Sequence, residues 1–250
     1  MASLRARPSP GSELVTQEVF GETVRIAAAR ADWVLCGARG SGDSSKGWLP
    51  LRYLAFPPGW RPTHFVARRF AALRALGASD LVLPMGSLVQ VTGRSGPIQK
   101  VALPGGGEGL VAARDLAQGA TPRLGAARFA AIAREVIGTP YLWGGTSTFG
   151  FDCSGLVQFL FGLLGKGLPR NSCEQARVGR PIRKLSELRP LDLLFFGQDR
   201  QVDHVAIHLG SLRMLHASGW VRIESLSSAS EHFRADLLAR FKGARRLVLR

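Results

Sequence analysis

The stretch that most constrains this chain is residues 141–157, YLWGGTSTFGFDCSGLV. A glycine-rich run leads into Asp-Cys-Ser-Gly, and an almost unbroken apolar segment follows as far as residue 164. Apolar residues on nearly every side predict a helix that is buried all round. Asp152 is a suitable N-cap, which places Cys153 in the first helical turn. There the unpaired N–H groups and the helix dipole favour a thiolate over a thiol.

Cys153 is therefore either a nucleophile or a small residue that fills space. For a cysteine considered alone, the second role is the more common one, because free cysteines are usually buried and unreactive. A nucleophile of this kind also needs a base. The histidines available to serve as that base stand at positions 64, 204, 208, 216 and 232.

The segment DHVAIHLGSLRMLHA, residues 203–217, reads as two short strands joined by a turn. A three-residue loop at 210–212 would place His216 opposite Ala206 and diagonal to His204 on the same face. Diagonal neighbours lie roughly 7–8 Å apart, within reach of long side chains. A two-residue loop would put the two histidines on opposite faces. The three-residue loop therefore predicts a thiol, a base (His204) and a second histidine (His216) that orients the base.

A series of short motifs follows in the second half of the chain. They are Tyr141 with WGG at 143–145, DCSGL at 152–156, PRNS at 169–172 with Gln175, DLLFF at 192–196, HV at 204–205 and HAS at 216–218. In this order they resemble the NlpC/P60 cysteine peptidases, papain-like hydrolases that cut bacterial cell-wall peptides. Several independent motifs in register are more specific than a lone Cys and His, so the nucleophile is the preferred interpretation of Cys153.

The resemblance implies that Cys153 is the nucleophile, His204 the general base and His216 the residue that holds the imidazole of His204. Tyr141 matches the family's tyrosine position and is expected to place its hydroxyl beside the thiolate. A tyrosine that only packs is the alternative. Cys173 is the rival nucleophile, but it lies at the start of a short predicted helix with no histidine near it in the matched pattern.

The resemblance also implies a substrate. Relatives with two SH3-like domains cleave murein peptides between γ-D-glutamate and a diamino acid, often where a free N-terminal L-Ala is present. Asp152, Ser154 and Ser172 match positions that line the substrate pocket, and a carboxylate there would pair with the substrate ammonium. Asp152 can serve as N-cap at the same time. Asn171 stands where relatives often carry Asp, which leaves the requirement for free L-Ala open.

The chain is expected to be multidomain. Residues 1–12 are predicted to be a flexible arm, 13–58 and 59–120 two small all-β SH3-like barrels, and 121–250 an α+β papain-like catalytic domain. The β segments follow from short alternating stretches with turn residues between them. The SH3-like assignment follows from resemblance to domains that accompany this peptidase family. In the last segment a helix is predicted over residues 125–137.

Composition limits the partners. The net charge is +15 and 33 of the residues are Lys or Arg. Such a charge is compatible with nucleic acid, an anionic membrane surface or an anionic wall polymer. The arginines are scattered, with no block of like charge and no interleaved aromatic platform. The charge is therefore interpreted mainly as a solvated surface, and no nucleic-acid partner is expected.

The three cysteines are odd in number and lack metal-ligand spacing, so a reduced compartment is the simpler explanation. The N-terminal residues lack the apolar core of a signal peptide, and no apolar run approaches the roughly 20 residues of a membrane span. A cytoplasmic protein without an integral membrane segment is expected. No cofactor is expected, and a metal held by His204 and His208 is rejected because no third ligand is placed near them.

Two other functions use the same scaffold. One is acyl or amide transfer with the same Cys–His pair, which would need a lipid-facing apolar patch. The other is a non-enzymatic wall-peptide-binding protein derived from a peptidase. Cys153, His204 and His216 are all present, which favours the peptidase over both.

Overall fold

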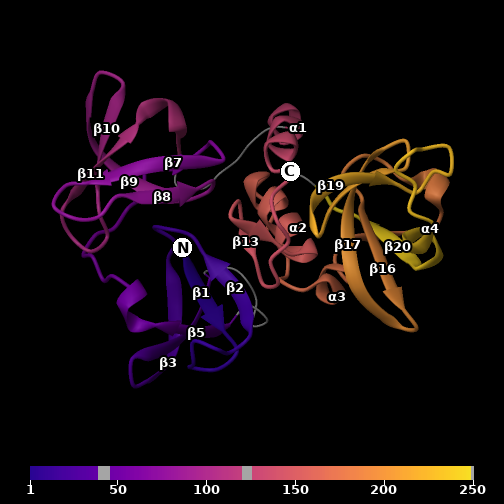
Figure 1. Cartoon of the computed structure of the whole chain (residues 1–250), viewed down its shortest axis with the longest axis horizontal. Helices are drawn as coiled ribbons and strands as arrows, with labels where there is room; N and C mark the ends of the chain where they lie inside the picture. The colour runs from indigo at the N-terminus through magenta and orange to yellow at the C-terminus, as the bar shows by residue number, and fades with distance from the viewer. Residues whose placement is uncertain (39–45, 120–125, 249–250) are drawn as a thin grey trace. The chain divides into compact units, whose positions relative to one another are not determined.

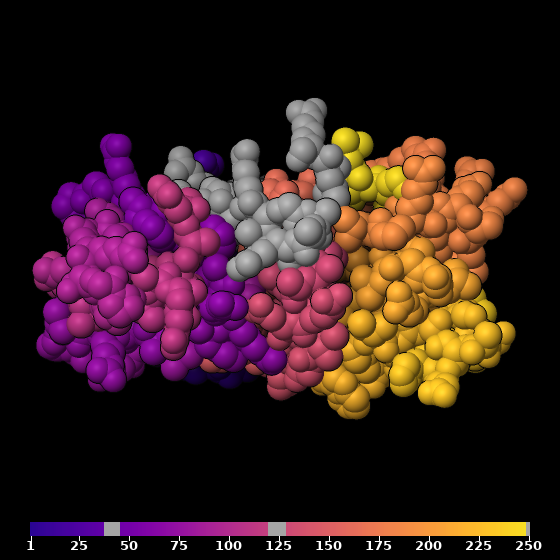
Figure 2. Space-filling view, turned by 90° about the horizontal axis from the view of Figure 1, so that it is seen from above, coloured from indigo at the N-terminus to yellow at the C-terminus, as the bar shows by residue number. Residues whose placement is uncertain are grey.

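The computed structural model describes residues 1–38, 46–119 and 126–248. The chain divides into two compact units, Met1–Leu124 and Gly125–Arg250 (Figure 1). The described part of unit 1 is built from strands and short 3-10 turns, whereas unit 2 has helices followed by an antiparallel sheet. In the space-filling view, the orange and yellow segments of unit 2, which follow one another along the chain, pack against each other (Figure 2).

The first sheet of unit 1 has the strand order β2-β1-β5-β4-β3. Its strands are β1 (Ala2–Arg5), β2 (Leu14–Glu18), β3 (Val24–Arg30), β4 (Trp33–Ala38) and β5 (Gly47–Pro50). β1 lies between β2 and β5 and pairs with both. Its Leu4 is fully buried in a small core with Val34, Cys36 and Leu49. The predicted flexible arm over residues 1–12 is therefore wrong for β1, because a buried side chain and two strand partners hold it in place.

The second sheet of unit 1 has the order β12-β6-β9-β10-β11-β7-β8. Its strands are β6 (His64–Val66), β7 (Phe70–Ala75), β8 (Leu81–Pro84), β9 (Leu88–Ser95), β10 (Ile98–Ala102), β11 (Glu108–Ala112) and β12 (Leu116–Gln118). The 3-10 turns η2 (Leu51–Tyr53) and η3 (Ala113–Asp115) follow β5 and β11. The second sheet and strands β2–β5 of the first lie within the two segments predicted as β domains, whereas β1 lies outside them. Their SH3-like class stays a prediction, and the predicted boundary at 120/121 lies outside the described residues.

Within its described residues, unit 2 contains four helices and a six-stranded sheet in the order β15-β20-β16-β17-β18-β19. The helices are α1 (Ala126–Glu135), α2 (Cys153–Leu163), α3 (Ser172–Gln175) and α4 (Ala235–Ala239). The sheet strands are β15 (Arg180–Ile182), β16 (Leu193–Gln198), β17 (Gln201–Gly210), β18 (Arg213–Ser218), β19 (Trp220–Ser225) and β20 (Phe241–Arg246). A small ribbon, β13 (Thr146–Ser147) with β14 (Gly150–Phe151), precedes α2, and the 3-10 turn η4 (Leu185–Glu187) follows β15.

Helix α2 is the centre of unit 2. None of its residues is exposed, and Leu156, Val157, Leu160 and Phe161 have no exposed surface. It packs against β17 and β18. The prediction of a helix buried all round is confirmed. None of the helices within the described ranges has the length and apolar character that a membrane span requires.

The β17–β18 hairpin has the register that the sequence predicts, but it reaches it by a different turn. Gly210 pairs with Arg213, so the turn has two residues, both with positive φ. A bulge between His208 and Gly210 supplies the missing residue and restores the pairing of Ile207 with Leu215. The predicted three-residue loop is thus wrong, while the resulting placement of His216 next to Leu215, diagonal to His204, is as expected.

Candidate active site

The nucleophile candidate lies at the first residue of α2. Asp152 caps the helix by accepting a hydrogen bond of 2.6 Å from the backbone N–H of Gly155. Its own N–H donates to the carbonyl oxygen of Gly145 at 3.0 Å. A Cβ at Gly155 would overlap that same carbonyl oxygen. The glycines on both sides of the cysteine therefore allow the loop at 144–145 to pack directly onto the first helical turn, which sets the position of Cys153.

The sulfur of Cys153 faces the N-terminal half of β17. Its thiol lies 4.0 Å from the carbonyl oxygen of Asp203, the residue before His204, and the side chain is only 7% exposed. Burial raises the pKa of Cys153 to about 11, and the charge of Asp152 adds to this. Hydrogen bonds from the N–H groups of Val205 and Ser154 lower the pKa and are outweighed. The helix dipole predicted a thiolate, but desolvation decides in favour of the neutral thiol.

The thiol contacts the backbone of the residues on both sides of His204, whose half-buried imidazole forms a chain with the buried imidazole of His216. Nε2 of His204 lies 2.9 Å from Nδ1 of His216, and Nε2 of His216 lies 2.7 Å from Oε2 of Glu224. A carboxylate only accepts, so His216 must donate from Nε2 and accept at Nδ1 when it is neutral. His204 then donates from Nε2, and its lone pair is on Nδ1. The hydrogen-bond chain leaves Nδ1 as the nitrogen of His204 that can take a proton.

Both histidines are held neutral. Burial is the main cause that lowers the pKa of His204 to about 3, and the neighbouring His216 adds to it. Burial likewise lowers the pKa of His216 to about 3, followed by the charges of Arg222 and Arg234. At neutral pH the site therefore rests as a thiol beside a neutral imidazole.

Glu224 is a residue of this site that the sequence motifs do not contain. Arg234 donates to it from Nη1 at 2.6 Å, and Arg222 approaches from Nε at 3.1 Å. Arg234 is itself held by Asp236 through two hydrogen bonds of 2.6 and 2.7 Å. Glu224 is fixed at the end of the imidazole chain by these arginines. In β18–β19, His216 pairs with Arg222, which makes Glu224 its diagonal neighbour. A tight hairpin at Gly219 was the sequence signal that could have identified it.

Tyr141 lies near the thiol. Its backbone N–H donates to the carbonyl oxygen of Gly219 at 2.8 Å, and it forms a bridge with Phe151, just before the α2 cap. Burial raises the pKa of Tyr141 to about 12, and the charges of Cys153 and Asp152 act in the same direction. The phenol is therefore protonated and can donate a hydrogen bond beside the sulfur.

The predicted substrate residues Asp152 and Ser154 contact a buried arginine. Arg170, which is 2% exposed, donates to both carboxylate oxygens of Asp152 and, at 3.0 Å, to the hydroxyl of Ser154. The N–H of Gly144 and the hydroxyl of Ser154 also donate to Asp152, at 3.0 and 3.2 Å. The carboxylate that the sequence assigned to a substrate ammonium already has a cationic partner within the protein.

The third predicted substrate residue, Ser172, begins α3 and is 9% exposed. Helix α3 is tied to α2 by Gln175, whose amide donates to the carbonyl oxygens of Ser154 and Pro169 at 3.1 and 2.9 Å. Cys173, the rival nucleophile, is exposed on α3. The imidazole of His208 is buried and bonded through Nδ1 to the carbonyl oxygen of Arg189 at 2.9 Å.

Residues 138–239 match the model of the NlpC/P60 family. This range contains the thiol, both imidazoles and the carboxylate described above. The chain contains an NlpC/P60 family domain. In the described parts of the chain, no group of three or more His, Cys, Asp or Glu side chains is arranged to hold a metal ion.

Similarity to known proteins extends beyond the NlpC/P60 domain. Over 222 residues the chain is 28% identical to a Bacillus subtilis (strain 168) protein named gamma-D-glutamyl-L-lysine dipeptidyl-peptidase, covering 81% of this chain and 71% of that protein. A protein of the same name from Bacillus cereus is 26% identical over 226 residues, covering 82% and 68%. The crystal structure of an NlpC/P60 family protein from Bacillus cereus superposes with a TM-score of 0.82 at 26% identity, covering 93% of this chain and 82% of that one.

Proposed function

We propose that this NlpC/P60 peptidase hydrolyses murein peptides at the bond between γ-D-glutamate and a diamino acid, with Cys153 as nucleophile. The observation that carries the proposal is the buried thiol at the start of α2, which contacts the backbone next to His204, together with the chain of two imidazoles and a carboxylate that His204 begins. Its hydrogen-bond pattern presents a proton acceptor, Nδ1 of His204, with no need for a metal or cofactor.

In the first step, the sulfur of Cys153 attacks the carbonyl carbon of the γ-glutamyl amide while its proton passes to Nδ1 of His204. The neutral resting pair makes this proton transfer part of the attack. The N–H of Cys153, one of the unpaired donors at the start of α2, is the proposed donor to the oxyanion. The imidazolium of His204 then protonates the leaving α-amino group of the diamino acid, and a thioester remains.

In the second step, His204 removes a proton from water, and the hydroxide attacks the thioester carbonyl. The C–S bond breaks, the thiolate recovers the proton from His204, and the γ-carboxylic acid leaves. His216 and Glu224 take no part in the bond changes. They are positioning residues that stabilise the positive charge of His204 in each half-reaction. Tyr141 is the proposed hydrogen-bond donor to the sulfur.

The substrate class is supported by the two relatives named gamma-D-glutamyl-L-lysine dipeptidyl-peptidase, which are 26–28% identical over most of this chain. The proposed substrate contacts are Asp152, Ser154 and Ser172. Because Arg170 neutralises Asp152, we propose that the pocket does not depend on a free ammonium as strongly as an unpaired carboxylate would. We also propose that the two sheets of unit 1 are SH3-like domains.

The proposal is tested with defined tripeptides, L-Ala-γ-D-Glu-L-Lys and L-Ala-γ-D-Glu-diaminopimelate, each with a free or an acetylated N-terminus. Mass spectrometry should detect release of the L-Ala-D-Glu dipeptide or its acetylated form. Cys153→Ala should lower kcat by a factor of about 10⁴ or more. Cys173→Ala serves as the matched control and should retain activity. Hydrolysis that survives Cys153→Ala, or an intact γ-glutamyl bond in all four peptides, would refute the assignment.

A further inference from the structure

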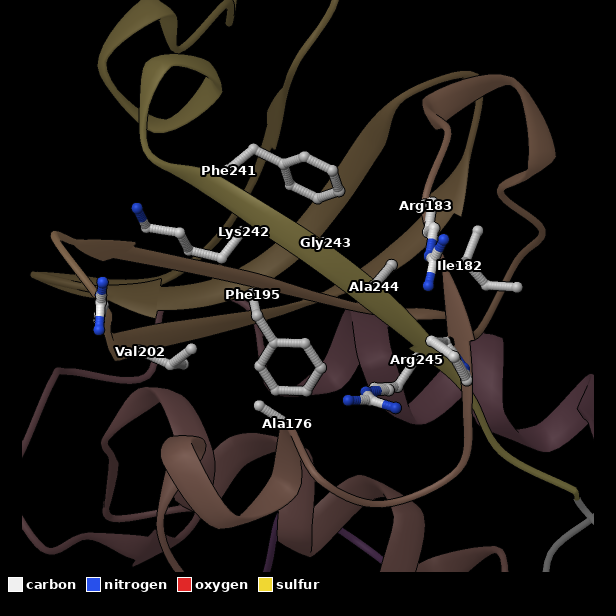
Figure 3. A pocket seen from close by; sticks show the side chains of 12 residues that line it. Ala176, Ile182, Arg183, Phe195, Val202, Phe241, Lys242, Gly243, Ala244 and Arg245 are labelled. Atoms are coloured by element: carbon white, nitrogen blue, oxygen red, sulfur yellow. The ribbon is translucent and has the colours of Figure 1, made fainter.

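A groove of about 670 Å³ lies on unit 2, and the side chains of Cys153, His204 and His216 do not line it (Figure 3). It follows one face of the sheet where β15, β20 and β16 are neighbours. Ala176, the C-cap of α3, borders it on the helix side. The groove is thus lined by residues other than the proposed catalytic ones.

The groove is open because of one glycine. Gly243 on β20 pairs with Phe195 on β16, and Ile182 pairs with Ala244, which puts Arg183 beside Gly243 on the other side. Gly243 has φ of 122°, a conformation that disfavours other residues, and a Cβ there would meet no atom closer than 3.8 Å. The floor between Arg183 and Phe195 is therefore backbone only, because Gly243 contributes no side chain there.

The lining is strongly basic. Arg183, Arg200, Lys242 and Arg245 line the groove, and no carboxylate is among its described lining residues. Figure 3 shows Arg183 and Arg245 toward one end and Lys242 toward the other, with Phe195 between them. The positive charges are therefore distributed along the hollow.

Other arginines of unit 2 have carboxylate partners. Arg234, Arg240 and Arg246 each pair with an Asp or Glu at 2.6–2.7 Å. By contrast, Lys242 and Arg245 donate to backbone carbonyl oxygens, at 2.8 and 3.4 Å. Within the described residues, none of the four groove cations forms an ion pair with a carboxylate. Their charge is not neutralised by the protein, which makes the groove a site for an external anion.

The shape and chemistry favour a flexible chain of phosphates. Guanidinium groups bind phosphate oxygens in pairs, and cations at both ends require a ligand with several anionic groups. A single-stranded nucleic acid would need exposed aromatic faces on which bases stack, but Phe195 is only 3% exposed, and Phe241 packs edge-on against Phe196 at the core. A cavity of this volume holds a short flexible segment and excludes a duplex.

We propose that this groove binds an anionic phosphodiester polymer with non-aromatic repeat units, of the poly(glycerol phosphate) type. Guanidinium groups of Arg183 and Arg245 hold phosphates at one end and Lys242 holds one at the other. The neutral spacers lie over Gly243 and Phe195. Such a site would bind the polymer independently of the peptide held at the proposed catalytic residues.

The test is fluorescence anisotropy of end-labelled poly(glycerol phosphate) with the full chain, over a range of salt concentrations. Arg183→Gln/Arg245→Gln should weaken binding about tenfold or more and reduce the salt slope by about 2, because two phosphate contacts are lost. The matched control is Arg189→Gln/Arg213→Gln, which removes the same charge from exposed positions of unit 2 outside the groove. It should change the affinity by less than about twofold.

Equal losses in the two double variants would overturn the proposal, because binding would then follow net charge alone. Absence of binding by the wild-type chain at physiological salt would also overturn it. The proposal would also be overturned if labelled oligothymidylate bound as tightly as poly(glycerol phosphate) and lost the same affinity in the Arg183→Gln/Arg245→Gln variant. Tripeptide hydrolysis by the groove variant should match the wild-type rate. Binding is measured without turnover, so its failure is distinct from failure of the proposed peptidase function.

Discussion

Glu224 offers the sharpest test of how the site works. Glu224→Gln keeps the shape of the side chain and one acceptor oxygen for Nε2 of His216, but it removes the negative charge. It also leaves the Arg222 guanidinium, 3.1 Å from Glu224 in the wild-type protein, without its carboxylate partner, whereas Arg234 loses Glu224 but keeps its ion pair with Asp236. The variant should therefore raise the free energy of the His204 imidazolium that forms during attack by the thiol.

The size of the effect follows from the 2.7 Å hydrogen bond between His216 and Glu224. A hydrogen bond to a charged acceptor contributes about 1.5–3 kcal/mol and one to a neutral acceptor about 0.5–1.5 kcal/mol. The difference of about 1.4 kcal/mol, expressed in the transition state, lowers kcat about tenfold. KM should change little, because Glu224 has no proposed contact with the peptide. Glu224→Ala, which also removes the acceptor, should lower kcat further, by about a hundredfold.

Steady-state kinetics on L-Ala-γ-D-Glu-L-Lys measure kcat and KM, and ¹⁵N NMR of the histidine side chains reports the tautomers directly. We expect the wild-type protein to carry the proton of both His204 and His216 on Nε2. Glu231→Gln is the matched control, since it removes a carboxylate from an exposed position of the same unit. Kinetics of Glu224→Gln within about twofold of wild type, or a wild-type His216 protonated on Nδ1, would refute the reasoning.

Three further predictions concern stability and pH. Arg170→Leu removes a buried cation from Asp152 and should lower the free energy of unfolding, measured by urea titration, by about 3–5 kcal/mol. A decrease of less than about 1 kcal/mol would contradict this expectation. The folded state keeps His204 and His216 neutral while the unfolded chain protonates them below pH 6.5, so stability should fall as the pH falls from 6.5 toward 3. The slope should reach at most about 1.4 kcal/mol per pH unit for each histidine, and His204→Gln/His216→Gln should flatten it. Burial lowers the pKa of His204 and raises that of Cys153, so kcat/KM should begin to fall only below pH 6.5 on the acid side and only above pH 9.0 on the basic side. A fall in kcat/KM between pH 6.5 and pH 9.0 would contradict a resting state with a neutral thiol and a neutral imidazole.

Much of the site follows from local sequence patterns. The period of the apolar residues after Cys153 indicates a helix buried all round, and Asp152 marks its first turn. The alternation of β17 and β18 places His204 and His216 on one face. The turn between them was nevertheless predicted wrongly. A two-residue turn with a bulge at His208–Gly210 gives the same register as a three-residue loop, and no sequence signal distinguishes these two arrangements.

Other features depend on contacts between residues far apart in the chain. Arg170 occupies the carboxylate of Asp152 because α3 is tied to α2 through Gln175, and no period of the sequence encodes that approach. Glu224 reaches His216 only because the β18–β19 pairing makes them diagonal neighbours. Residues 1–12, expected to form a flexible arm, include strand β1. Its four residues are too few to show a strand pattern in the sequence, and only its pairing with β2 and β5 identifies it.

The sequence by itself therefore determined which residues are the candidates for nucleophile and base and which elements hold them, because capping and periodicity are properties of neighbouring residues. Only the tertiary structure decided the protonation state of the thiol. A helix N-terminus alone predicts a thiolate at Cys153, but the packing of α2 against β17 and β18 removes water from the sulfur. Desolvation outweighs the helix dipole there, and its size depends on every atom that surrounds the group.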